Sequence, residues 1–230
     1  MARHVVALGG GGFTTDDDPR LDDFVLGLTG RDRPRVCFLA TAQGDSPSYV
    51  VDFYDAFRER AETAHLTLFG RPRRDIRDFL LAQEVVYVGG GNTANMLAIW
   101  RVHGVDQVLR EAWERGIVLA GISAGSICWF EWGVTDSFGD ELASLRCLGF
   151  LSGSNCPHYD SGPERRPTYR RLVESGELPA GLAADDGVGL HFAGTELAEA
   201  VTARPDAGAY RVERGENGAV ERPITVRRLG

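Results

Sequence analysis

The stretch that most constrains the fold of this 230-residue chain is GIVLAGISAGSICW, residues 116–129. Its apolar run at 117–120 is typical of a buried strand. The pentapeptide Gly121-Ile122-Ser123-Ala124-Gly125 follows, and the residues after it can begin a helix. A G-x-S-x-G sequence between a strand and a helix is the nucleophile-elbow pattern, which makes a sharp turn above the edge of an α/β sheet.

This pattern allows two interpretations of Ser123. In one, the turn lifts the hydroxyl above the sheet, where the free N–H groups and dipole of the next helix favour developing negative charge. Ser123 is then a nucleophile. In the other, Ser123 only caps the helix of a tight turn. Four strand candidates precede the motif, as an α/β sheet requires, and this context favours the nucleophile.

Strand and helix patterns alternate along the first half of the chain. Short apolar runs predict strands, and 3.6-residue hydrophobic spacing predicts helices. The strands are expected at 4–8, 35–41, 65–69, 84–88 and from 118, and the helices at 21–28, 48–61, 75–82, 93–102 and 105–115. Such alternation gives right-handed βαβ units. We therefore expect a three-layer α/β fold whose central sheet is mostly parallel and has helices on both faces.

The C-terminal part is less regular. It suggests a helix at 163–176, strands of an antiparallel edge at 188–192 and 199–212, and a hairpin and loop from Glu213. No repeat, low-complexity tract or linker separates a further domain, so residues 1–230 are expected to form a single α/β domain.

Charge and composition restrict the class of protein. A net charge of −8 argues against general nucleic-acid binding. No apolar run reaches the length of a membrane span, and the first apolar stretch is too short for a signal peptide. The cysteines lack C-x-x-C spacing, which favours reduced thiols in a cytoplasmic protein. They stand at Cys37, Cys128, Cys147 and Cys156, the last a candidate lining residue of the site.

Glycine-rich turns follow two of the expected strands. The run at 9–12 does not have G-x-G-x-x-G spacing, and no acidic residue follows the second strand, so a dinucleotide cofactor is not expected. Gly89-Gly90-Gly91-Asn92-Thr93 opens a helix, which Asn92 or Thr93 can cap. The N–H group of Gly90 or Gly91 can also supply half of an oxyanion hole, with Ala124 N–H as the other half.

A nucleophilic serine needs a base, and histidine is the usual one near neutral pH. His158 lies in Asn155-Cys156-Pro157-His158, directly after a strand-like run, where a loop can reach Ser123. The other histidines stand at the wrong end of the expected sheet, in a helix–helix loop or within a strand. They are His4, His65, His103 and His191.

The acid that orients the base is not decided by spacing. Asp136 or Asp140 would give the chain order of α/β-hydrolases, Ser–Asp–His, whereas Asp185 or Asp186 would give Ser–His–Asp. Asp160 is nearest to the histidine in sequence, but a residue two positions away usually points elsewhere.

Residues 164–171, ERRPTYRR, hold four arginines in an otherwise acidic chain. Most are expected to form a solvated helix face, and one is a candidate for a two-point contact with a substrate carboxylate. No H-x-x-H or H-x-E spacing indicates zinc, so no metal is expected.

Four motifs in this order resemble the peptidase E family of serine peptidases, α-aspartyl dipeptidases that are related to cyanophycinase. The motifs are Gly89–Thr93, Gly121–Ser126, Asn155–His158 and Ala183–Gly187, and the resemblance extends from the first strand to about residue 212. The family is similar in fold to class I glutamine amidotransferases, with serine in place of the nucleophilic cysteine.

The resemblance implies a catalytic triad of Ser123, His158 and Asp186. The family usually has glutamate where Asp186 stands here, so the shorter side chain must lie closer to His158; Asp185 and Asp136 are the alternatives. The resemblance also implies a metal-independent enzyme that hydrolyses dipeptides with N-terminal aspartate. Arg166 and Asn92 are the expected substrate-binding residues, and the other candidate arginines are Arg165, Arg170 and Arg171.

Three rival functions are left open at this stage. They are a cyanophycinase-like or other serine hydrolase on the same scaffold, a binding protein without activity, and an α/β-hydrolase esterase with Asp136 or Asp140 as its acid. The expected partner is a small peptide substrate, and a monomer and a homodimer are equally compatible with the sequence.

Overall fold

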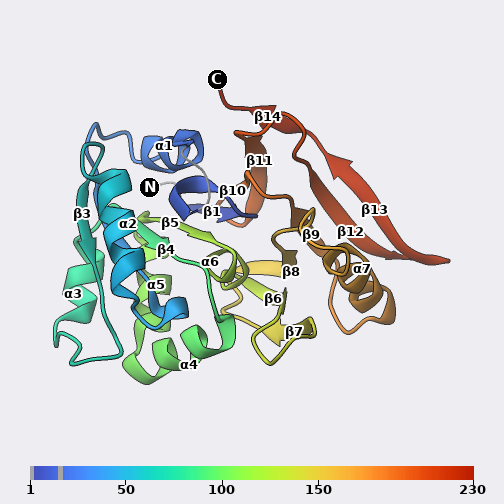
Figure 1. The fold of residues 1–230 in the computed structure, drawn as a ribbon, viewed down its shortest axis with the longest axis horizontal. Coiled ribbons are helices and arrows are strands. Elements are labelled where there is room, and N and C mark those ends of the chain that lie inside the picture. The colour runs from blue at the N-terminus through green and yellow to red at the C-terminus, as the bar shows by residue number, and fades with distance from the viewer. Residues whose placement is uncertain (1–2, 15–17) are drawn as a thin grey trace.

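The computed structural model describes residues 3–14 and 18–230, and the strands in these ranges form two sheets. The larger sheet contains β1 (His4–Leu8), β2 (Arg35–Leu39), β3 (Glu62–His65), β4 (Val85–Val88), β5 (Val118–Ile122), β10 (Val188–Ala193), β11 (Glu196–Thr202) and β14 (Val226–Arg228). Their order is β14-β11-β10-β1-β5-β4-β2-β3 (Figure 1). The strands from β1 to β3 in this order are parallel, whereas β10 and β11 form an antiparallel edge.

Helices cover both faces of the larger sheet (Figure 1). Val6 and Leu8 of β1 belong to the core formed with α1 (Arg20–Gly27) and α2 (Pro47–Phe57). Val5 and Ala7 face the opposite core, which contains α3 (Ile76–Leu81), α4 (Thr93–His103) and α5 (Val105–Glu114). Successive strand residues point to opposite faces, so an apolar strand such as β1 can bury both sides.

The smaller sheet is built from the C-terminal half of the chain. It contains β6 (Phe130–Thr135), β7 (Ala143–Arg146), β8 (Leu151–Cys156), β9 (Gly181–Ala184), β12 (Ala209–Gly215) and β13 (Gly218–Ile224), in the order β13-β12-β9-β8-β6-β7. The neighbours β6, β8 and β9 are parallel. Helix α7 (Arg165–Ser175) packs on this sheet, and the short α6 (Ala124–Ile127) leads from the larger sheet into it.

The predicted fold class is confirmed: the chain is α/β, with a mostly parallel central sheet, helices on both faces and an antiparallel edge from the C-terminal part. The smaller sheet was not expected, because strands such as β6 and β8 mix buried and exposed residues and lack a long apolar run. The single strand expected at 199–212 is divided into β11 and β12 by a turn around Pro205. Strand β3 lies at 62–65 rather than at 65–69.

The remaining features of the fold concern helices and thiols. Short 3-10 turns follow two strands, at Gly12–Thr14 and Thr41–Gln43. In the described part of the chain, no helix is both long and apolar enough to cross a membrane. The thiols of Cys37, Cys128, Cys147 and Cys156 are free and buried.

A buried carboxyl group lies where α1 meets the larger sheet. Asp22 is 1% exposed, and Tyr87 of β4 donates its hydroxyl to Oδ1 at 2.8 Å. Within the described ranges, Oδ2 has no hydrogen-bond partner. Burial raises the pKa of Asp22 from 3.8 to about 6, because loss of hydration disfavours the charged form.

Asp22 should make the protein less stable as the pH rises from about 4 to about 7. The native state retains a proton that the unfolded chain releases in this interval, so the free energy of unfolding falls by about 3 kcal/mol through this group. Asp22→Asn keeps the acceptor for Tyr87 and should flatten this fall, as measured by urea unfolding across the pH range. The exposed Asp78→Asn is the control. An equal slope in wild type and Asp22→Asn would contradict the prediction.

Candidate active site

Ser123 stands at the end of β5 in a backbone conformation that few residues adopt. Its φ is 56° and its ψ is −109°, and α6 begins at the next residue. The Ser123 carbonyl accepts the N–H groups of Ser126 and Ile127, both at 2.9 Å. Such strain, of order 1–3 kcal/mol, persists only where surrounding contacts enforce it. The sharp turn expected from the G-x-S-x-G sequence is therefore present.

The glycines of this turn allow close backbone contact. A Cβ atom on Gly121 would lie 2.4 Å from the carbonyl oxygen of Gly125, and one on Gly125 would lie 2.3 Å from that of Val88. The helix after the turn is fixed to the smaller sheet, because the Ser126 hydroxyl donates to Asn155 Oδ1 at 2.9 Å. Any larger residue at 121 or 125 would displace the turn that carries Ser123.

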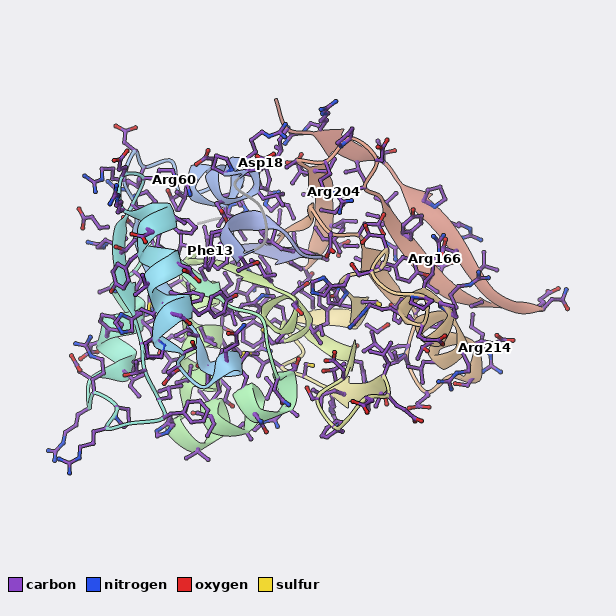
Figure 2. All side chains as sticks on the ribbon, in the orientation of Figure 1. Phe13, Asp18, Arg60, Arg166, Arg204 and Arg214 are labelled. Carbon is purple, nitrogen blue, oxygen red and sulfur yellow. The ribbon has the colours of Figure 1, made fainter. Side chains whose placement is uncertain are left out.

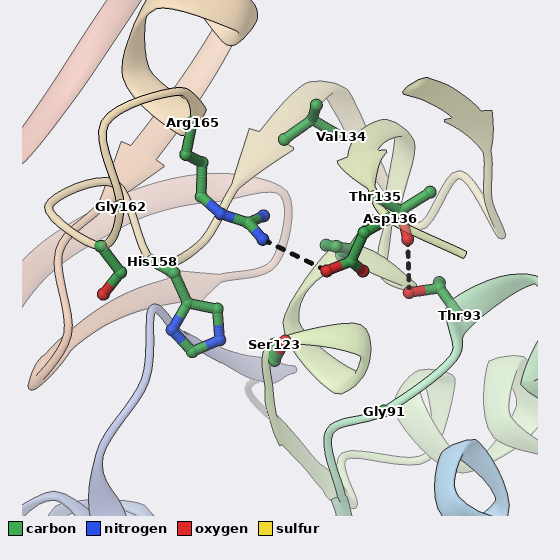
Figure 3. Close-up of a pocket in the computed structure, with 11 residues that line it drawn as sticks. Gly91, Thr93, Ser123, Val134, Thr135, Asp136, His158, Gly162 and Arg165 are labelled. Atoms are coloured by element: carbon green, nitrogen blue, oxygen red, sulfur yellow. Dashed lines mark hydrogen bonds and ion pairs between the residues drawn. The ribbon is translucent and has the colours of Figure 1, made fainter. Parts of the chain in front are cut away.

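His158 reaches the same pocket as Ser123 from the smaller sheet. It follows the end of β8 and has a φ of 55°, and its N–H donates to the carbonyl of Gly9 at 2.9 Å. Ser123 and His158 both line a pocket of about 560 Å³, a size that accommodates a small ligand. Figure 3 shows the imidazole beside Ser123.

Asp186 contacts the imidazole on its other side. Asp186 Oδ1 lies 2.5 Å from His158 Nδ1, and Oδ2 accepts the Ser161 hydroxyl at 2.6 Å. Although burial acts to raise the pKa of Asp186, the hydrogen bonds from His158 and Ser161 outweigh it and lower that pKa. The group is thus a carboxylate near neutral pH, which favours Nδ1 as the protonated nitrogen and leaves Nε2 unprotonated.

The topology explains why these two residues meet. Strands β8 and β9 are parallel neighbours with Cys156 opposite Ala183. His158 and Asp186 follow the carboxyl ends of these strands, which lie at the same edge of the sheet. The Asp186 N–H donates to Asp160 Oδ1 at 2.8 Å, and Arg204 donates to the Asp186 carbonyl at 3.0 Å. Asp160 therefore holds the backbone of Asp186 rather than the imidazole.

The first glycine run, which follows β1, packs against the Asp186–His158 pair. A Cβ atom on Gly10 would lie 2.0 Å from Asp186 Oδ1 and 2.9 Å from His158 Nδ1. The Gly10 carbonyl also accepts the N–H of Gly187 at 3.0 Å. The turn after β1 thus connects the larger sheet to both loops of the smaller sheet that carry the pair, and only a residue without a side chain fits there.

The alternative acids have other contacts. Asp185 is 5% exposed and accepts the N–H of Gly208 at 2.8 Å, and burial raises its pKa. Asp136 lines the pocket, where its carboxylate lies 3.7 Å from the guanidinium of Arg165. Asp140 is exposed. In the described residues, Asp186 is the carboxylate that contacts the His158 ring.

The candidate oxyanion-hole groups differ in availability. The N–H of Gly90 donates to the Tyr49 hydroxyl at 3.1 Å. Gly91, with a φ of 131°, lines the pocket. Neither the Gly91 N–H nor the Ala124 N–H, which opens α6, has a hydrogen-bond partner among residues 3–14 and 18–230. Ala124 and Gly91 are therefore better placed than Gly90 to bind an anion.

The structure separates the two adjacent arginines at the start of α7. Arg165 lines the catalytic pocket, its side chain is 16% exposed, and its guanidinium extends toward Asp136 (Figure 3). Arg166 pairs with Glu221 outside the pocket lining, near β12 and β13 (Figure 2). Helix geometry explains the split, because consecutive residues point about 100° apart. Arg166, the arginine expected to bind substrate, is therefore outside the pocket lining, and Arg165 is the candidate in its place.

The side chain of Asn92, the other expected substrate-binding residue, makes hydrogen bonds within the protein. Its Oδ1 accepts the N–H of Asn95 at 2.9 Å and caps α4, and its Nδ2 donates to the carbonyl of Ser137 at 3.0 Å. Its neighbour Thr93 lines the pocket instead. Asn92 thus fixes the rim of the pocket through residue 137.

Comparison with known proteins identifies the family. The model of peptidase family S51 matches residues 5–200. The uncharacterized peptidase YgaJ of Bacillus subtilis (strain 168) is 49% identical over 230 residues, which cover 99% of this chain and 100% of the relative. The chain belongs to peptidase family S51. It is therefore a peptidase, and its substrate is a peptide.

Solved structures share the fold of this S51 peptidase. A peptidase from an acI-B1 Actinobacterium superposes with a TM-score of 0.70 at 17% identity, covering 98% of this chain and 95% of its own. A proposed peptidase E of Listeria monocytogenes EGD-e gives 0.58 at 16% identity, with 98% and 100% covered. Together with the family match, these findings confirm the resemblance to the peptidase E family.

Several residues of the S51 peptidase site were missed or assigned otherwise from sequence. In the sequence, Gly10 belongs to a glycine run that does not fit a dinucleotide-binding turn, and no motif includes Ser161. Gly10 had no local signal, since its partners are distant in the chain.

Among the described residues, no group of three or more His, Cys, Asp or Glu is arranged to hold a metal.

Gly10→Ala should lower turnover of a peptide substrate on the order of 100-fold, because displacement of a catalytic group by about 1 Å has an effect of that size. The added Cβ would overlap Asp186 Oδ1 and push it from His158. Gly27→Ala on α1 is the matched control, since a Cβ there meets nothing within 4 Å. Steady-state kinetics measures both. Wild-type turnover in Gly10→Ala would show that the tight contact is not needed.

Proposed function

We propose that this peptidase is a serine-type dipeptidase that cleaves short peptides with an unblocked N-terminal aspartate through Ser123, His158 and Asp186. The observation that carries the proposal is the shared pocket of Ser123, His158 and Arg165, with Asp186 behind the imidazole. It combines a hydroxyl that lines the pocket, a base with a fixed tautomer and a cation beside the reaction centre.

In the proposed reaction, Ser123 Oγ attacks the peptide carbonyl carbon while His158 Nε2 takes the hydroxyl proton. The N–H groups of Ala124 and Gly91 stabilise the oxyanion. His158 then gives the proton to the leaving amino group as the C–N bond breaks, which leaves an acyl ester on Ser123. Water attacks this ester, His158 takes the proton of the water, and the acid leaves as Ser123 Oγ regains that proton.

The charges of the pocket support an aspartyl substrate. Arg165 is mostly buried, and no hydrogen-bond acceptor for its guanidinium lies among the described residues; its nearest anion is Asp136 at 3.7 Å. A guanidinium that lines a pocket and has no acceptor within the protein favours an anionic ligand. The substrate side-chain carboxylate would bind Arg165, and its free α-ammonium group would bind Asp136. The pocket volume of about 560 Å³ suits a peptide of this size.

Ser123→Ala should lower turnover on Asp-Leu by on the order of a million-fold, as loss of a triad nucleophile does. Hydrolysis of Asp-Leu, Asn-Leu, Glu-Leu and N-acetyl-Asp-Leu by the purified wild type, followed by chromatography, tests specificity together with reaction type. Unblocked Asp-Leu should be cleaved far faster than the other three. Cleavage of Asp-Leu by Ser123→Ala at the wild-type rate would end the serine mechanism.

Arg165→Ala should lower kcat/KM for Asp-Leu by on the order of 10- to 100-fold, because it removes a hydrogen bond to a charged group. The same change should alter kcat/KM for Asn-Leu much less, since the amide carries no charge. Arg171→Ala, an exposed arginine of the same helix, is the control. Equal losses on the two substrates would mean that Arg165 supports the pocket without recognising the carboxylate.

A further inference from the structure

A hydrogen bond joins the catalytic loop to the hairpin formed by β12 and β13. Tyr159, the residue after His158, is 1% exposed, and its hydroxyl donates to Glu221 Oε2 at 2.5 Å. Glu221 stands on β13, which is the outer strand of the smaller sheet (Figure 1). A buried tyrosine hydroxyl needs such an acceptor.

Arg166 also contacts Glu221 and Tyr159, and these three residues form a cluster. Its Nε donates to Glu221 Oε2 at 3.2 Å and its Nη2 to Oε1, and its guanidinium lies 5.1 Å from the ring centre of Tyr159 and 4.9 Å from that of Tyr210. Burial acts to raise the pKa of Glu221, but the hydrogen bonds from Arg166 and Tyr159 outweigh it and lower that pKa. The Glu221 carboxylate thus accepts from two residues at once, and both of these follow β8 in the chain.

This cluster restrains the backbone of His158, because Tyr159 is the next residue in the chain. His158 has a φ of 55°, a conformation that a residue with a side chain adopts at a cost and keeps only when its neighbours are fixed. On one side, the N–H of His158 itself donates to the carbonyl of Gly9 at 2.9 Å. On the other side, Tyr159 is held by its N–H to the carbonyl of Ala184 at 3.1 Å and by its hydroxyl to Glu221.

We infer that Glu221 is a positioning residue of the active site: through the Tyr159 hydroxyl, the C-terminal hairpin holds His158 in the geometry that accepts the Ser123 proton. The inference rests on the proposed role of His158 as base. The hairpin, β12 and β13, lies beyond residues 5–200, which the family model matches.

The hairpin carries a second ion pair that serves as a matched control. Glu213 of β12 pairs with Arg222 of β13 at 2.9 Å, and the Arg222 side chain is 67% exposed. Both pairs join a glutamate of the hairpin to an arginine, but Arg166 belongs to α7 whereas Arg222 belongs to β13, and Tyr159 hydrogen-bonds to Glu221 rather than to Glu213. Removal of Glu213 changes the hairpin without changing the contact that is proposed to matter.

The experiment compares Glu221→Ala, Glu221→Gln, Tyr159→Phe and Glu213→Ala by steady-state kinetics on Asp-Leu. Glu221→Ala should lower kcat on the order of 10- to 100-fold with KM nearly unchanged, because a misplaced base slows the chemical step. Glu221→Gln should recover much of the loss, since its amide oxygen still accepts the Tyr159 hydroxyl. Tyr159→Phe should lose kcat in the same direction, and it keeps the test available if Glu221→Ala does not fold. Glu213→Ala should match wild type.

Two results would overturn the inference. One is a kcat of Glu221→Ala, or of Tyr159→Phe where the former does not fold, equal to that of Glu213→Ala. The other is a raised KM with unchanged kcat, which would mean that the hairpin shapes substrate binding. Ser123→Ala, assayed beside these variants, separates the two claims. If Ser123→Ala is inactive and Glu221→Ala is fully active, only the positioning role fails; if Ser123→Ala is active, the proposed function itself fails.

Discussion

The close contact of Gly10 with the Asp186–His158 pair is the constraint on which the site depends. The 2.5 Å contact between Asp186 Oδ1 and His158 Nδ1 lies directly over a residue that has no room for a methyl group. The carbonyls of Gly9 and Gly10 accept N–H groups from both loops that carry the pair. Backbone contacts from β1 thus set where the imidazole stands relative to Ser123 on the neighbouring strand β5.

The two sheets share the work of building the pocket. The larger sheet supplies Ser123 at the end of β5 and the glycine turns after β1 and β4, whereas the smaller sheet supplies His158 and Asp186. Helix α6 leads directly from one sheet to the other, and its Ser126 hydroxyl donates to Asn155 of β8. Because Ser123 and His158 come from different sheets, contacts at this junction decide their relative position.

Sequence patterns could predict the strand–turn–helix at Ser123, because the glycines at 121 and 125 report a local steric requirement. They also gave the parallel central sheet, since its strands are buried on both faces and read as apolar runs. The smaller sheet was not predicted, because strands such as β6 and β8 mix buried and exposed residues and their pairing is set by distant partners. The sequence does not show which of Arg165 and Arg166 faces the pocket, because their side-chain directions depend on where α7 begins.

Contacts between distant residues could not be predicted either. The Tyr49 hydroxyl, which accepts the N–H of Gly90, is 41 residues away in sequence. The catalytic roles of Ser123, His158 and Asp186 stay predictions.

The central claim is that Ser123 forms a covalent acyl-enzyme with His158 as its base. The most direct test is intact-protein and peptide mass spectrometry after reaction with a fluorophosphonate, applied to wild type, Ser123→Ala and His158→Ala. If this claim holds, the wild type carries one phosphonyl group on Ser123, Ser123→Ala carries none, and addition to His158→Ala is much slower. Addition at another residue, or equal addition in all three proteins, would contradict it.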